Sequence, residues 1–373
     1  MAVKYLAGER LIGTAAERAA LSGSNLTAVP QTSWKELGRT TLSSNGTLTV
    51  SSFAAKDNLM ILGYYKSVSG NVTSGLVLNS DTNNNYANRR TLNGGADATR
   101  VNTDNLPCIQ TDGAYGGSEW SFFYTTIKNI ANQEKLAISE INPNADTGVG
   151  TAPNSESTVS KWTNTANQIT TIQLTDGAGS TSQTWASGSE VIVLGCDDDE
   201  ADSGTNFWQE IEKSPAYTSG TDLSSGTVHT NTFTAKKYLM VSVKTKSVGT
   251  NYANYKWRFN SDTGSNYAAR YSDNGGSDGT STSAANIMTR VGEVASGHAL
   301  ATAFIVNRSD TDKLGILHVV QGGATGAGTA PTRNEVVFKW GNTSSQITSM
   351  GGVSSSGSGT NLGELEIRIW GSN

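Results

Sequence analysis

Apolar and polar residues alternate along most of the chain. In the segment ELEIRIW, charged residues separate Leu365, Ile367 and Ile369, so these three side chains leave a strand on the same side. The segments YLMVSVKTK (238–246) and YKWRFN (255–260) have the same period of two. This period predicts antiparallel strands with one face buried and the other facing water.

The predicted strands are short and closely spaced. SEWSFFY places Trp120, Phe122 and Tyr124 together on the apolar face of one such strand. About eight runs of this kind occur in each half of the chain, separated by turns, and none has the spacing of a β–α–β unit. The pattern predicts an all-β protein built from two-sheet antiparallel β-sandwiches of the jelly-roll type.

The chain contains the same domain twice. Segments of the first half recur in the same order in the second half: SWKEL (33–37) as FWQEI (207–211), FAAKDNLM (53–60) as FTAKKYLM (233–240), GTAPNSESTVSKW (150–162) as GTAPTRNEVVFKW (328–340), and QIT (168–170) as QIT (346–348). Such an internal repeat predicts two tandem domains, residues 26–198 and 205–373, joined by an acidic linker at 199–204. Residues 1–25 have no second copy. They predict an arm with helical character, which either packs on the first domain or docks the protein to a larger assembly.

A loop rich in Asn, Asp, Gly and Tyr occurs once in each repeat, at 76–97 and 257–278. Its candidate binding residues are Asp81, Asn85, Tyr86 and Arg89 in the first repeat, and Asp262, Asn266, Tyr267 and Arg270 in the second. These residue types close turns and clamp a loop onto a sandwich, which is the favoured interpretation. They also suit recognition of glycans, through stacking and hydroxyl contacts, or of calcium, although the D-x-D-x-D-G spacing of a calcium loop is absent.

Charge and composition limit the partners. The net charge is −5 and basic residues are scattered, so we expect no nucleic-acid partner. No apolar stretch approaches the ~20 residues of a membrane helix, and the N-terminal residues lack the apolar stretch of a signal peptide. Cys108 and Cys196 are the only thiols. A disulfide between them stays open at this stage, and two free thiols are the favoured interpretation. Synthesis in the cytoplasm without export is expected.

Catalytic and metal-binding patterns are missing from the sequence. The three histidines, His229, His298 and His318, have no repeated Cys, His or Asp partners that would form a zinc site. Nothing resembles the Gly-x-Ser-x-Gly turn of a serine hydrolase. A carboxylate pair for glycoside hydrolysis stays open at this stage. The prediction is a non-enzyme without metal or cofactor.

Three segments together resemble a recurring domain of tailed-phage virion proteins: WRFNSDTGSNYAARYSDNGG, KWGNTSSQITSM and the closing GELEIRIWG. Such domains occur in tail fibres, head fibres and capsid decorations. The positions that fit the family pattern in the second repeat are Phe259, Asn260, Asp262, Thr263, Gly264, Asn266 and Tyr267. The first repeat departs from it at Leu78 and Asn83. The resemblance implies jelly-roll-like sandwiches on a particle exterior, in symmetric oligomers, without catalytic residues.

The expected function is therefore that of a non-enzymatic structural protein of a virion exterior, a fibre or a capsid-decorating subunit. Its expected partners are other capsid or tail proteins, further copies of itself and host glycans. One alternative is a carbohydrate-binding adhesin or lectin, and another is a polysaccharide-degrading enzyme with a sandwich fold.

Overall fold

The computed structural model of the chain describes residues 34–68, 73–109, 119–143, 147–177, 182–197, 206–214, 230–248, 255–289, 297–322, 330–354 and 361–373. Within these ranges every regular element is a β-strand. No helix in them has the length and apolar character that a membrane crossing needs. The predicted arm and the acidic linker lie outside the described residues.

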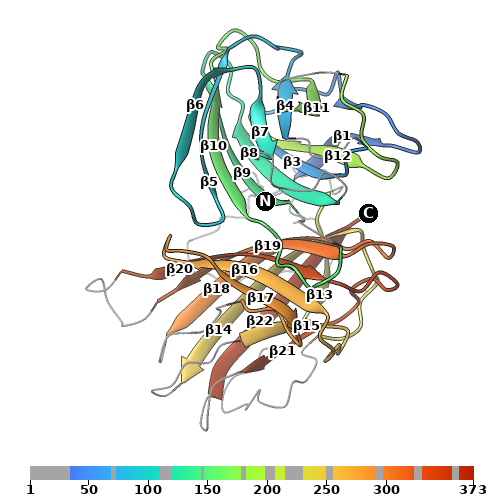
Figure 1. Cartoon of the computed structure of the whole chain (residues 1–373), viewed down its shortest axis with the longest axis vertical. Coiled ribbons are helices and arrows are strands. Elements are labelled where there is room, and N and C mark those ends of the chain that lie inside the picture. The colour runs from blue at the N-terminus through green and yellow to red at the C-terminus, as the bar shows by residue number, and fades with distance from the viewer. Residues whose placement is uncertain are drawn as a thin grey trace, which may run out of the picture.

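The first half of the chain folds into a sandwich of an eight-stranded and a four-stranded sheet (Figure 1). The large sheet has the order β1 (Lys35–Thr41), β12 (Glu190–Cys196), β3 (Asn58–Tyr65), β8 (Ser121–Lys128), β9 (Lys135–Pro143), β10 (Glu156–Trp162), β5 (Tyr86–Leu92) and β6 (Ala98–Thr103). The small sheet has the order β2 (Leu48–Val50), β11 (Ile172–Asp176), β4 (Ser74–Leu78) and β7 (Leu106–Ile109). All neighbouring strands are antiparallel.

The second half repeats the strand order of the large sheet, and its small sheet has two strands among the described residues. Its large sheet has the order β13 (Gln209–Lys213), β22 (Asn361–Ser372), β14 (Tyr238–Val248), β18 (His298–Val306), β19 (Lys313–Gln321), β20 (Thr332–Trp340), β16 (Tyr267–Asp273) and β17 (Gly279–Ala284). The small sheet contains β15 (Tyr255–Phe259) and β21 (Met350–Ser354). In both halves the chain passes back and forth between large and small sheet, as in a jelly roll. The all-β fold with two sandwich domains is confirmed.

Each sandwich has the core that the alternation predicts. Leu365, Ile367 and Ile369 lie in the core of the second sandwich around Trp257 and Trp340. The large sheet must bury one face of every strand, so the polar partners of these residues point outward. A second core of the same kind, around two fully buried tryptophans, fills the first sandwich.

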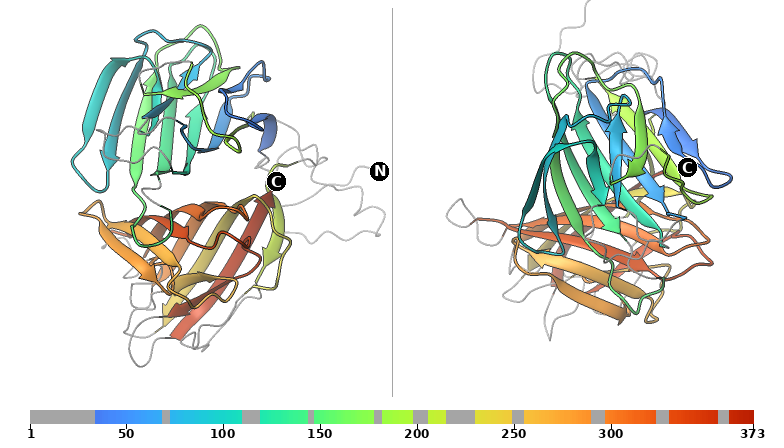
Figure 2. Two further views of the ribbon diagram at one scale, coloured as in Figure 1. Left: turned by 45° about the vertical axis from the view of Figure 1, so that its right-hand side comes forward. Right: turned by 45° about the horizontal axis from the view of Figure 1, so that its top comes forward.

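A third core lies between the two sandwiches. The outer faces of the two large sheets meet here. The buried side chains of this core, which include Phe207 and Trp208 from the segment before β13, are Met60, Leu62, Tyr64, Phe122, Ile192, Leu194, Phe207, Trp208, Tyr238, Val306, Leu314, Ile316 and Val337. Figure 2 shows the two sandwiches stacked in this way. Tyr124 and Phe304 meet across the boundary with ring centroids 4.7 Å apart. The prediction of a wet outer face is wrong for these strands, because that face is covered by the other domain.

The aromatic face of SEWSFFY shows the same correction. Phe123, rather than Phe122, enters the core of the first sandwich. Phe122 belongs to the third core, and Trp120 and Tyr124 pack against it. The side chains predicted to share one face do so, but that face points to the neighbouring domain.

The strand register gives each residue of one large sheet a counterpart in the other. Tyr124 lies opposite Glu140 in the first domain, and Thr302 lies opposite His318 at the same place in the second. By the same register, Ile138 in β9 corresponds to Ile316 in β19. Ile316 is buried in the third core, whereas Ile138 is exposed.

This pair of isoleucines tests the third core. Because only Ile316 would leave a buried cavity, we expect Ile316→Ala to lower the free energy of unfolding by about 2–4 kcal/mol, and Ile138→Ala to change it by less than about 0.5 kcal/mol. Urea denaturation of dilute protein, followed by tryptophan fluorescence, measures both. Equal losses in the two variants would contradict the packing described.

Candidate functional site

The loop predicted to carry binding residues is an internal brace. The indole N–H of Trp162 donates a hydrogen bond to Asp81 Oδ2 (2.8 Å), and Asn85 Nδ2 donates to the same oxygen (2.9 Å). The hydroxyl of Tyr86 donates to the backbone carbonyl of Asp81 (2.8 Å) and accepts from the amide N–H of Leu78 (3.1 Å). Asp81 therefore ties the loop after β4 to the end of β10.

The second repeat builds the same brace. Trp340 donates to Asp262 Oδ2 (2.7 Å), and Asn266 Nδ2 donates to it at 2.9 Å. Tyr267 lies parallel to the Trp340 ring with a centroid distance of 6.3 Å, and its hydroxyl accepts from the N–H of Phe259 (3.0 Å).

A half-buried asparagine explains why QIT recurs with the loop. Asn79 Oδ1 accepts the backbone N–H groups of Thr170 (2.9 Å) and Thr171 (3.0 Å), while Asn79 Nδ2 donates to the carbonyl of Gln168 (2.8 Å). Asn260 makes the equivalent contacts in the second repeat. Asn79 and Asn260 have positive φ angles of 49° and 50°, a conformation that asparagine adopts more readily than most residues.

Hydrogen bonding sets the charge of the two brace carboxylates. Partial burial alone would raise the pKa of Asp81, but hydrogen bonds from Asn85, Trp162 and Asn83 outweigh it and hold the pKa below its usual value. The pKa of Asp262 is lowered in the same way, with Trp340 as the leading donor. Both side chains are therefore ionised at neutral pH and held in place by donors of the fold.

The remaining candidate residues do not lie together at one site. Arg89 is exposed and pairs with Asp97 at 3.3 Å, whereas Arg270 Nε donates to the carbonyl of Pro153 in the other domain (2.9 Å). The rings of Tyr86 and Tyr267 are buried. No group of three or more His, Cys, Asp or Glu suited to a metal ion occurs in the described part of the chain. Glycan or calcium binding by these loops stays a prediction.

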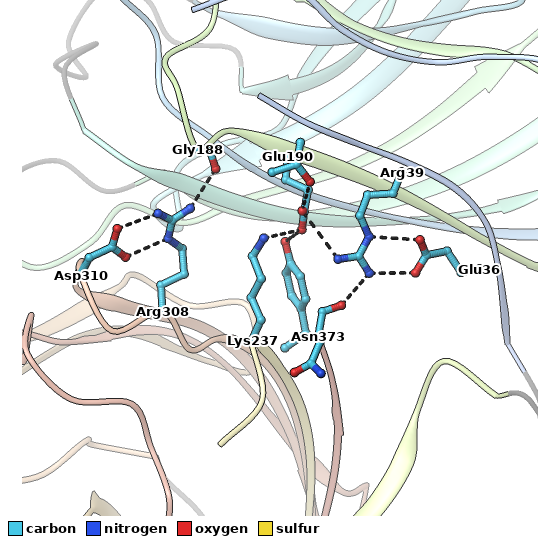
Figure 3. A network of polar contacts seen from close by, with 10 residues as sticks. Glu36, Arg39, Gly188, Glu190, Lys237, Arg308, Asp310 and Asn373 are labelled. Atoms are coloured by element: carbon cyan, nitrogen blue, oxygen red, sulfur yellow. Dashed lines mark hydrogen bonds and ion pairs between the residues drawn. The ribbon is translucent and has the colours of Figure 1, made fainter. Parts of the chain in front are cut away.

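A polar network that the sequence did not indicate joins the two domains at Glu190 (Figure 3). Glu190 comes from β12 and is buried. From the second domain, Lys237 Nζ lies 2.8 Å from Glu190 Oε1, and the hydroxyl of Tyr238 donates to it at 2.6 Å. From the first domain, the Thr41 hydroxyl donates to Glu190 Oε2, and Arg39 lies 3.6 Å from that oxygen.

This network keeps Glu190 ionised despite its burial. Burial alone would raise the pKa of Glu190, but the charge and hydrogen bond of Lys237, with the hydroxyls of Thr41 and Tyr238, hold the pKa below its usual value. A buried carboxylate is costly unless its charge is compensated. Because Lys237 and Tyr238 come from the other domain, separating the domains would leave Glu190 without two of its partners.

An arginine of the second domain completes this edge of the interface (Figure 3). Arg308 Nη1 donates to the carbonyl of Gly188 in the first domain (2.9 Å) and Arg308 Nη2 to Asp310 (2.7 Å). The guanidinium lies 5.6 Å from the ring centroid of Tyr64 and 5.3 Å from that of Trp120. These distances suit cation–π attraction between the domains.

A small polar pocket of about 140 Å³ lies between the domains at the other end of the sheets. It is lined by both Asn-Gly-Gly turns and by Glu140, Asp278, Arg333 and Glu335, among others. Glu140 accepts a hydrogen bond from Ser157 (2.8 Å), and its Oε2 lies 3.9 Å from His318 Nε2.

Burial and nearby negative charge act together on Glu140. Its burial, reinforced by the charge of Glu335 and opposed by Ser157 and Arg333, raises the pKa of Glu140 to about 8. Burial lowers the pKa of His318, so His318 is neutral at neutral pH. A carboxylic acid that stays protonated near neutrality is suited to proton transfer as well as to holding an interface together.

Continuous apolar runs were the sequence signal for this interface. β3 reads NLMILGYY and β12 reads EVIVLGC, without the polar alternation of a half-wet strand. Such runs are typical of strands buried on both faces. His298 is exposed, and His229 lies outside the described residues.

Comparisons with known proteins do not indicate a function. No family model matches, and no curated protein matches. Among solved structures, the LG1-3 region of the laminin alpha2 chain is 8% identical with a TM-score of 0.20, and the match covers 90% of this chain and 62% of that one. The outer membrane protein OprG from Pseudomonas aeruginosa is 8% identical with a TM-score of 0.10, covering 86% and 99%. An acyl-CoA hydrolase from Agrobacterium tumefaciens is 6% identical with a TM-score of 0.12, covering 76% and 100%.

The brace makes a prediction for Asp81. Asp81→Ala leaves the Trp162 indole N–H without its acceptor, so we expect a loss of about 1–3 kcal/mol in stability at pH 7. Because the folded-state pKa of Asp81 is depressed, its contribution is present above the unfolded value of 3.8 and is lost as pH falls through the folded value. Thermal unfolding at pH 7 and at pH 3 measures the difference. Arg89→Ala is the control, with little change expected, and an Asp81→Ala effect equally small would rule out the brace.

The interdomain pocket makes a prediction for Glu140. Its folded-state pKa of about 8 exceeds the ordinary value of 4.5, so wild-type stability falls as pH rises between these values. Glu140→Gln retains a neutral side chain and removes this loss, so the variant should exceed wild type by roughly 2 kcal/mol or more at pH 9 and match it at pH 4. His318 lies beside an uncharged side chain in both proteins at pH 4 and is neutral in both at pH 9, so it contributes equally at the two pH values compared. A pH-independent difference in urea denaturation would contradict the assignment.

Proposed function

We propose that the chain is a non-enzymatic structural protein of a virion exterior, a fibre or capsid-decorating subunit. The observation that carries the proposal is the third core, which turns two tandem sandwiches into one body. The repeated loops and the network at Glu190 hold that body together. A structural subunit needs domains that keep a fixed orientation to each other, and these contacts fix it.

The sequence resemblance to tailed-phage virion domains supports the same proposal. It covers both repeats, and the positions that carry it include Asp262 and Tyr267, which form the brace of the second sandwich. The partners proposed are capsid or tail proteins of the particle and further copies of the chain. The proposed location is the virion, with synthesis in the host cytoplasm.

A carbohydrate-binding adhesin is the second candidate, and the interdomain pocket favours it. Carboxylates, hydroxyls and the Arg333 guanidinium line this pocket together, and groups of these kinds bond sugar hydroxyls. Binding of the purified chain to a glycan array, lost on Arg333→Ala, would favour the adhesin. A fixed and symmetric copy number in purified particles would favour the structural protein.

The predicted arm provides a test in the particle. Among the residues that the structure describes, the members of the three cores lie between 34 and 370, and we expect a chain lacking residues 1–25 to keep its thermal unfolding midpoint. We expect that chain to be missing from purified particles, where immunoblotting detects the full chain. Attachment at the full-length level would exclude the docking role of the arm, and absence of the full chain from particles would overturn the proposed function.

A further inference from the structure

Exposed apolar side chains are concentrated on the outer faces of the two large sheets. Seven large apolar side chains are exposed among the residues that the structure describes. Six of them lie on these faces: Val101 (70% exposed) on the edge strand β6, Leu136 (59%), Ile138 (52%), Val159 (49%), Leu300 (46%) and Val320 (45%). Ile138 and Val159 are direct cross-strand partners, as are Leu300 and Val320.

Three of these exposed residues in the first domain have counterparts in the second domain that belong to the third core. The strand register aligns Leu136, Ile138 and Val159 with Leu314, Ile316 and Val337, which are the same residue types in the same order. We call this set of positions the aliphatic half of the outer face. It is buried in the second domain, where the first domain covers it, and exposed in the first domain.

The two exposed residues in the second domain have counterparts in the first domain that lie on the other side of the same interface. Leu300 and Val320 align with Phe122 and Asn142 of the first domain. Phe122 lies in the third core, and Asn142 Nδ2 donates to the carbonyl of Gly315 across the boundary (3.0 Å). We call the positions of Phe122 and Asn142, and of their counterparts Leu300 and Val320, the aromatic half of the outer face. The name refers to Phe122.

The interdomain contact is therefore heterologous. The aromatic half of the first domain packs on the aliphatic half of the second, which leaves an aliphatic half free on the first domain and an aromatic half free on the second. The free and the covered halves lie at opposite ends of the same strands, since β9 carries Leu136 near its start and Asn142 near its end. A contact of this type repeats head to tail and closes into a ring or extends as a filament.

We propose that the chain associates with a second copy of itself head to tail, with Leu136, Ile138 and Val159 of one copy packing on Leu300 and Val320 of the next. The new contact uses the same strand positions as the one already present within the chain. The second domain is less apolar there than the first, because Ser242, Lys244 and Arg368 take the register positions of Leu62, Tyr64 and Ile192. The surface beside Leu136 and Ile138 is continuous with the third core through Trp34. A groove of about 340 Å³ beside Leu136 and Ile138, lined by Trp34 and Leu59 among others, gives the neighbouring side chains a place to insert.

This inference rests on the proposed function, because it names the partner through which the building block acts. The two can fail separately. Self-association is measured on the purified chain without particles, whereas the virion role is measured by the presence of the chain in particles.

Two charge substitutions and a matched control test the contact. Ile138→Glu removes the free aliphatic half and Leu300→Glu removes the free aromatic half. Val68→Glu is the control, because Val68 is 43% exposed after the end of β3 and lies outside the strands of both large sheets. Sedimentation velocity of the full chain over a range of concentrations should show association for wild type and for Val68→Glu. Each of the other variants should associate at least about tenfold more weakly.

Mixing the two variants tests whether the contact is head to tail. Ile138→Glu keeps a good aromatic half and Leu300→Glu keeps a good aliphatic half, so their mixture should form a one-to-one dimer that grows no further. Thermal unfolding midpoints equal to that of wild type verify that both variants fold. A monomeric wild type at all concentrations would overturn the proposal. So would loss of association in Ile138→Glu alone, or association that begins only after removal of residues 1–25.

Discussion

The packing of one large sheet against the other determines the form of this protein. Each sandwich closes its own core, as tandem domains do, but the outer faces of β3, β8 and β12 are also apolar and need a partner. The second domain supplies it with Phe304 and Ile316. Burial of a large apolar side chain stabilises by about 1.5–3 kcal/mol, so a core of this size makes the two repeats one body.

Duplication explains both the likeness of the two domains and their difference. The brace of Asp, Tyr and Trp and the asparagine that holds QIT are the same in both, because each sandwich needs them to close. The outer faces have diverged. Glu190 is buried between the domains, whereas Glu366, at the same register position, pairs with Arg368 at 2.6 Å outside the third core. The same side chain thus stabilises an interface in one copy and a sheet surface in the other.

The sequence predicted what depends on local pattern. Alternation around Ile367 identified a strand and its buried face, and repeated segments identified two domains. The turn chemistry around Asp81 identified a clamp, but not that Trp162 is the partner, because 81 residues separate them in the chain. The third core was missed for a related reason. Periodicity tells which side of a strand is apolar, but not whether that side faces its own sandwich or a neighbour, as Phe122 and Phe123 show.

Differential scanning calorimetry of the intact chain tests most directly whether the two repeats form one body. If the third core couples them, the chain unfolds in a single transition whose calorimetric and van't Hoff enthalpies agree. Two separate transitions, each with the enthalpy of a single sandwich, would contradict the account.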